Sequence, residues 1–242
     1  MENLKRFILL GSITVVALGI FREVFVLSNG LETPLQELRQ FDLDAENNVP
    51  SWWSSSLMLA SAMVMFLFAK ADDNRGLFHS KVWLPLATVF LLLSIDESAS
   101  FHEALMNPLR TVLDAGGIFY YAWVVPAFLC LAVFGLLILR SFLRLPGNIQ
   151  FAFALAGLIY VSGALGMELF GGWLDYSGLR METIYSLSII VEETLEITGL
   201  TLFLLALIRL AEQHVTLRIN GQVPHSASRR EKVTADAKPV AS

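Results

Sequence analysis

Six long apolar blocks separated by short connections constrain this chain more than any other feature of its sequence. The blocks cover about residues 7–28, 52–70, 82–106, 119–143, 149–173 and 183–210. A helix that crosses the core of a bilayer needs about 20 apolar residues, and each block is about that long. The composition agrees, because 55% of the 242 residues are hydrophobic, only 16% are charged and the mean hydropathy is +0.60. We therefore expect an all-α fold, a polytopic bundle of six transmembrane helices.

The positive charges indicate how these helices cross the membrane. Thirteen lysines and arginines lie near the termini and in the second and fourth connections, whereas the opposite connections hold only Arg39, Arg110 and Arg180. Loops rich in lysine and arginine stay in the cytoplasm, so we expect both termini to be cytoplasmic, in a bacterial inner membrane. Residues 1–210 form the expected membrane domain. The polar tail, 211–242, has too few apolar residues to build a core, and we expect it to be disordered.

Acidic residues interrupt three of the blocks. They occur in "SIDESASFHEAL" (94–105) in the third block, in "GALGMELFGG" in the fifth and in "VEETLEITG" in the sixth. With the expected topology these segments lie at similar depth, in the outer half of the bundle. Ionisable residues inside a membrane usually mark a functional site. The candidate site residues are Asp96, Glu97, His102, Glu103, Glu168, Glu192, Glu193 and Glu196.

The energy of these charges indicates that they have partners. An acidic residue at the centre of a membrane helix opposes insertion by about 2.5–3.5 kcal/mol, and the sixth block carries three. The basic residues at this depth are Arg22 and His102, too few to balance the candidate carboxylates together with Glu23. Either several carboxyl groups are protonated, or cations lie among them, or water reaches them. Glu23, Glu103 and Glu168 also have a simpler interpretation as interfacial charges near helix ends.

Helical spacing predicts which groups converge. In the sixth block, Glu192, Glu193 and Glu196 are three and four residues apart and form one acidic patch. In the third, Asp96, Ser100 and Glu103 share a face of a continuous helix, flanked by Glu97 and His102. Carboxylates and histidine on facing helices are typical of metal-carboxylate bundles. Oxygen-rich ligation with one imidazole suits manganese, iron(II), magnesium or calcium better than zinc or copper.

The first external connection is acidic and allows two interpretations. "DLDAEN" (42–47) places oxygens at alternate positions, as a calcium-binding loop does, but it lacks that loop's glycine and its closing glutamate. A solvated acidic loop that starts the second helix fits better. Just before it, Leu31, Leu35, Leu38 and Phe41 recur at helical spacing and predict a short interfacial helix.

These patterns favour a membrane protein with an outward-facing, carboxylate-rich site that binds or transports a cation, a divalent metal or a proton. Its expected partners are the lipid bilayer and the cation. A metal-dependent enzyme acting on a lipid or other apolar small molecule at the outer leaflet is the second hypothesis, and a non-catalytic assembly protein the third. The polar residues of the inner halves of the third and sixth blocks are mainly Thr88, Thr198 and Thr201, which counts against transport. The sequence shows no nucleic-acid-binding surface.

Two segments, "FDLDAENNVPSWWSS" (41–55) and "SIDESASFHEAL", resemble segments of uncharacterised bacterial multi-pass membrane proteins. The resemblance covers most of the chain. It implies a membrane-embedded helical fold and carries no function with it.

Overall fold

The computed structural model describes residues 1–29, 38–71 and 80–221, and the regular elements of these ranges are all helical. They are α1 (Glu2–Asn29), the 3-10 turn η1 (Arg39–Phe41), α2 (Val49–Lys70), α3 (Ser80–Ala99), α4 (Phe101–Leu113), the 3-10 turn η2 (Gly117–Phe119), α5 (Val124–Phe142), α6 (Gly147–Val161), the π-helical turn η3 (Ser162–Met167), α7 (Glu168–Tyr176) and α8 (Thr183–Gly221).

Within this described part, six segments are long and apolar enough to cross a membrane. They are Glu2–Asn29, Val49–Lys70, Lys81–Ala99, Val124–Phe142, Gly147–Tyr176 and Thr183–Gln213. The predicted all-α fold with six spans is confirmed. The chain is a multi-pass membrane protein whose apolar helices contact the lipid bilayer.

The chain divides into two compact units, Met1–Leu207 and Ile208–Ser242, and the arrangement described below is that of the first. In the second, α8 continues past the expected end of the sixth block and reaches Gly221. Residues 222–242 lie outside the described ranges, so the division at 210 and the disordered tail stay predictions. The interfacial helix predicted around Leu31 and Leu35 also falls outside them, apart from the short turn η1.

The sequence predicts one continuous helix for the third apolar block, but the structure divides this block into two helices. α3 ends at Ala99, Ser100 adopts a left-handed conformation with φ of 54°, and α4 begins at Phe101. The Asp96 side chain accepts a hydrogen bond from the backbone N–H of His102, and such side-chain bonds compete with helical ones. Because of this break, Ser100 and Glu103 do not continue the face of Asp96, and that part of the prediction is wrong.

α4 is an amphipathic helix outside the six spans. Phe101, Leu105 and Val112 expose 56%, 51% and 80% of their surface, whereas His102, Glu103, Met106 and Asn107 line an internal cavity. An apolar face opposite a polar one is typical of helices that lie at the membrane surface.

Small residues bring the long helices close together. Between α2 and α3, the Ser55 hydroxyl donates to the carbonyl of Ser94 (2.8 Å), and the Ser94 hydroxyl donates back to the carbonyl of Ser55 (2.9 Å). Between α1 and α8, the hydroxyls of Ser12 and Thr201 are 2.6 Å apart. Small and hydroxyl residues are typical of helix contacts in membranes, where close packing and hydrogen bonds replace the hydrophobic effect.

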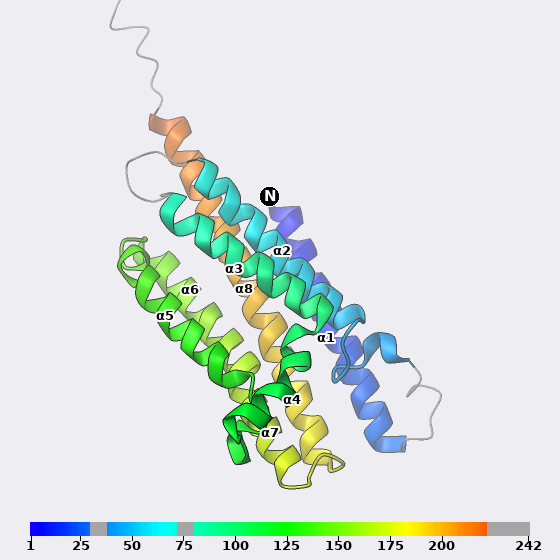
Figure 1. Ribbon diagram of the computed structural model, residues 1–242. Coiled ribbons are helices and arrows are strands. Elements are labelled where there is room, and N and C mark those ends of the chain that lie inside the picture. The colour runs from blue at the N-terminus through cyan, green and yellow to red at the C-terminus, as the bar shows by residue number, and fades with distance from the viewer. Residues whose placement is uncertain (30–37, 72–79, 222–242) are drawn as a thin grey trace, which may run out of the picture. The chain divides into compact units, whose positions relative to one another are not determined.

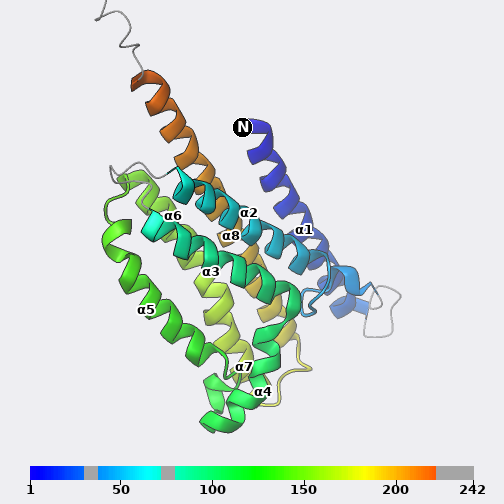
Figure 2. The same ribbon diagram turned by 45° about the horizontal axis from the view of Figure 1, so that its top comes forward.

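Two glycines set the contact of α8 with the segment α6–η3. A Cβ on Gly199 would lie 2.6 Å from the backbone nitrogen of Tyr160, and one on Gly163 would lie 2.8 Å from Cγ of Glu196. These helices therefore touch through their backbones at the level of the α8 glutamates. In both views α6 lies between α5 and α8, and α4 and α7 lie at the end of the unit where α8 begins (Figures 1 and 2).

Candidate functional site

A cavity of about 950 Å³ lies within the first unit, bounded by α3, α4, α5, α6, α8 and the loop before α2. Nine carboxyl groups line it, and the basic side chains among its lining residues are His102 and Arg180. The carboxyl groups are those of Asp44, Glu46, Asp96, Glu97, Glu103, Glu168, Glu192, Glu193 and Glu196. All eight residues predicted from the sequence therefore face one space.

His102 is fixed by Asp96 across the break between α3 and α4. Oδ1 of Asp96 accepts the backbone N–H of His102 at 3.0 Å, and Oδ2 lies 2.9 Å from Nδ1 of the ring. A carboxylate only accepts, so Nδ1 carries the hydrogen of this contact and Nε2 of the neutral ring keeps its lone pair. Metal-binding histidines are commonly oriented in this way by a carboxylate on the other nitrogen.

Two further carboxylates meet this histidine. One possible ligand atom from each of Glu46, His102 and Glu103 lies within 4.8 Å of the others, close enough for the three to share one ion. The set combines two consecutive residues in the first turn of α4 with one from the loop before α2. The α3–α4 break and the loop conformation therefore create it together.

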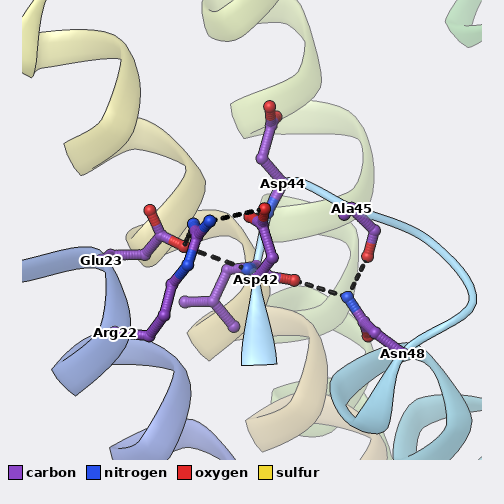
Figure 3. A network of polar contacts seen from close by, with 7 residues as sticks. Arg22, Glu23, Asp42, Asp44, Ala45 and Asn48 are labelled. Carbon is purple, nitrogen blue, oxygen red and sulfur yellow. Dashed lines mark hydrogen bonds and ion pairs between the residues drawn. The ribbon is translucent and has the colours of Figure 1, made fainter. Parts of the chain in front are cut away.

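The loop that carries Glu46 is held by an ion-pair network (Figure 3). Arg22 of α1 lies 2.6 Å from Oε1 of Glu23 and 2.9 Å from Oδ2 of Asp42. Oε1 of Glu23 also accepts the backbone N–H of Leu43 at 3.2 Å. At the other end of the loop, Asn48 donates to the carbonyls of Asp42 and Ala45 and caps α2. The segment before Glu46, residues 42–45, is thus held in place at both ends.

One carboxylate oxygen of Glu46 has no hydrogen-bond partner in the described part of the chain. This oxygen, Oε2, is buried. Burial, opposed by His102 and reinforced by the negative charge of Glu103, raises the pKa of Glu46 to about 7. For His102, burial lowers the pKa, but the hydrogen bond and charge of Asp96, with Glu46 and Glu168, raise it above its usual value. An unbonded buried carboxylate oxygen beside an imidazole is an arrangement that a cation would satisfy.

Trp123 connects the histidine to the fifth span. Its ring lies 4.9 Å from that of His102, and its Nε1 donates to Oε1 of Glu168 at 2.6 Å. The π-helical turn η3 directly precedes Glu168, and single π-helical turns are frequent at functional sites. Glu168 also lies close enough to Glu192 of α8 for the two carboxyl groups to interact electrostatically.

A second polar cluster lies where α7 turns into α8. The Tyr121 hydroxyl is 3.0 Å from Oδ2 of Asp175 and 2.9 Å from the Tyr185 hydroxyl, and Arg180 donates to the same Asp175 oxygen at 2.9 Å. Burial and the hydrogen bond to Tyr185 raise the pKa of Tyr121. Arg180 already has a carboxylate partner here, so it leaves the acidic charge of the cavity largely unbalanced.

The sequence of the chain matches one known family. The model of the family described as "Domain of unknown function (DUF8692)" matches residues 8–210. The chain belongs to this family. No curated protein and no solved structure matches it. The resemblance to uncharacterised membrane proteins is confirmed, and the matched residues of the DUF8692 domain include every candidate site residue.

Sequence reasoning missed several residues that the fold brings to the cavity. Glu46 and Asp44 belong to the loop that the sequence predicts to be solvated, and Trp123 lies inside the apolar block 119–143. The alternating oxygens of "DLDAEN" were the available signal for Glu46. For Trp123, an indole inside an apolar block without an interfacial position was a sign that its N–H had a partner.

Proposed function

We propose that this protein binds a divalent metal ion in an outward-facing, carboxylate-rich cavity, with Glu46, His102 and Glu103 as ligands. One observation carries the proposal: His102, which Asp96 orients through Nδ1, offers a ring nitrogen within 4.8 Å of possible ligand atoms of Glu46 and Glu103. The other predicted residues, Glu97, Glu168, Glu192, Glu193 and Glu196, would then supply further ligands or hold protons around the ion. Metal binding would also neutralise charge that the described basic residues leave uncompensated.

Ligand chemistry favours manganese or iron(II) over magnesium and calcium. Carboxylates suit magnesium, calcium and manganese, whereas imidazole suits the transition metals. Manganese and iron(II) accept both kinds of ligand. In the proposed topology both termini lie in the cytoplasm of a bacterium and the cavity opens on the outer side of the inner membrane.

The packing inward of the cavity favours a closed site over a transport path. Below Glu196, α8 presents the buried apolar side chains of Ile197, Leu200, Leu204 and Leu207. A metal-dependent enzyme acting on a lipid or other apolar substrate is therefore the second candidate function. The observation that favours it is the apolar wall that α3 and α5 give to the same cavity.

The test is the melting temperature of the purified, chelator-stripped protein with manganese, iron(II), magnesium, calcium or zinc. A ligand at about 100 times its dissociation constant stabilises the folded state by about 2.7 kcal/mol. We expect manganese or iron(II) to raise the melting temperature of the wild type and of a Glu182→Gln control, whose carboxyl is exposed outside the cavity. The double variant Glu46→Gln, Glu103→Gln should lose the shift. Equal shifts in all three proteins would refute the site.

A further inference from the structure

The cavity is much larger than a metal ion requires. At about 950 Å³ it is at the upper end of the range, about 300–1,000 Å³, of pockets that enclose whole organic molecules. The proposed metal ligands occupy only the part next to α4. The rest of the space is large enough for an organic molecule.

The walls of the remaining space differ in chemistry. One part of the lining is acidic: Glu97 of α3 and Glu193 and Glu196 of α8 are close enough to affect one another electrostatically. Another part is apolar and is built from Val89 and Leu93 of α3 and Leu129, Val133, Phe134 and Leu137 of α5. A molecule that fills the cavity therefore needs both a polar and an apolar part.

The apolar wall also reaches the outer surface of the protein. Leu129, Val133 and Leu137 are four residues apart and lie on one face of α5. They line the cavity, yet 66%, 50% and 75% of their surface is exposed. Side chains that belong to a cavity wall and to the outside at once form its rim. Because α5 is a membrane span, this rim opens toward lipid, and an alkyl chain could enter between α3 and α5 without passing through water.

The charge of the polar wall selects the head of such a molecule. In the described part of the chain no ion pair joins Glu97, Glu193 or Glu196 to a basic side chain, and Arg180 is paired with Asp175. An anionic head such as a phosphate or sulfate would be repelled by these carboxylates. A neutral head would leave their charge uncompensated inside a membrane protein. A positively charged amine would be attracted to all three.

We propose that the cavity binds a cationic amphiphile, an alkylammonium compound whose head lies among Glu97, Glu193 and Glu196 and whose chain lies along Val133 and Leu137 toward the membrane. This site goes beyond the proposed metal site, because it needs none of the three proposed metal ligands, Glu46, His102 and Glu103. The two can therefore succeed or fail separately.

The test uses a dodecylammonium probe with a photoreactive diazirine in its chain, added to the full chain in phosphatidylcholine nanodiscs. Probes with the same chain and an alcohol or sulfate head serve as chemical controls. After irradiation, mass spectrometry locates the labelled peptides. We expect the ammonium probe to label the cavity faces of α3 and α5, with unlabelled dodecylammonium competing. Equal labelling by all three probes, or labelling spread over the exposed faces of α1 and α5, would overturn the proposal.

Matched variants test the position of the chain and of the head. Val133→Trp should obstruct the opening and abolish cavity labelling, whereas Leu136→Trp, at a more exposed position of α5 outside the cavity lining, should not. Glu193→Gln with Glu196→Gln should weaken binding by roughly tenfold or more, as removal of buried charge partners does. His102→Ala should retain labelling while losing any metal-dependent stabilisation. Unchanged labelling in both the Val133 and the glutamate variants would refute the site, whatever the outcome of the metal titration.

Discussion

Asp96 holds His102 at two points across a break between helices, accepting its backbone N–H at 3.0 Å and facing its Nδ1 at 2.9 Å. The first contact fixes where α4 begins relative to α3. The second fixes the ring and its tautomer. The Asp96 carboxylate thus links the backbone geometry of the site to the chemistry of His102, the one histidine among the residues that line the cavity.

Replacing Asp96 by asparagine separates these two tasks. The amide oxygen can still accept the backbone N–H of His102, so the chain should fold. The amide NH₂ then faces Nδ1 and donates to it, which places the hydrogen on Nε2 and blocks its lone pair. We expect metal affinity, measured by titration calorimetry, to fall by about 10–100-fold, as when other side chains that orient a metal ligand are changed. Asp114→Asn, an exposed αL position where asparagine is accepted, is the control. Unchanged affinity in Asp96→Asn would show that Nε2 is not a ligand.

Metal binding should depend on pH with a definite sign. The pKa of Glu46 is raised to about 7, and that of His102 is also raised. Both groups must lose a proton to bind metal, so the affinity should increase as the pH rises from about 6 to about 8. Calorimetry in buffers of different ionisation enthalpy should detect the released protons. An affinity that is constant over this interval would mean that neither group is a ligand.

The metal-free protein should show the opposite trend. A carboxyl whose pKa is higher in the folded than in the unfolded state contributes stability below its unfolded pKa and loses it as the pH rises through the folded one. For Glu46 this window runs from the ordinary value of 4.5 to about 7. We expect the melting temperature of stripped protein to fall across this window, and the fall to be smaller in Glu46→Gln. Equal falls in variant and wild type would contradict the pKa shift of Glu46.

The glycine contact of α8 with α6 should be sensitive to one methyl group. A Cβ on Gly199 would lie 2.6 Å from the backbone nitrogen of Tyr160, and backbone cannot move aside as a side chain can. We expect Gly199→Ala to lower the free energy of unfolding by about 1–3 kcal/mol. Gly157→Ala on α6, where a Cβ would have no neighbour within 4 Å, should be neutral or slightly stabilising. Reversible unfolding in mixed detergent measures both, and equal effects would contradict the close contact.

The orientation of the chain can be tested with single cysteines on a Cys130→Ala background. Gln40 and Asn148 are exposed and belong to connections predicted to lie on opposite sides of the membrane. A membrane-impermeant maleimide added to intact spheroplasts should label Gln40→Cys, and should label Asn148→Cys only after permeabilisation. The reverse pattern would place the cavity on the cytoplasmic side.

The spans were predictable because crossing a membrane depends mainly on the length and polarity of a segment. The break at Ser100 was not, because nothing in "SASF" opposes a helix. The break depends on the Asp96 side chain accepting the backbone N–H of His102. Tertiary structure decides whether this side-chain bond or a helical backbone bond forms. Helical periodicity correctly predicted that His102 and Glu103 lie near the other cavity carboxylates. It did so from a continuous helix, which the structure does not have.

The contribution of the loop residue Glu46 to the site could not be predicted from the sequence, for a different reason. Glu46 meets His102 only because the loop is held by Arg22, Asp42 and Asn48. No local pattern encodes that pairing, since Arg22 and Asp42 belong to separate segments. The sequence shows that the loop is acidic, but it does not show that the loop turns its carboxylates toward His102.

The π-helical turn at Ser162–Met167 sets the rotational register of the residues that follow it in the fifth span. Such a turn accommodates one residue more than an α-helix of the same rise. Removing one residue from it would restore a regular helix and rotate everything beyond by about 100°, which would carry Glu168 away from Trp123 and Asp175 away from Tyr121.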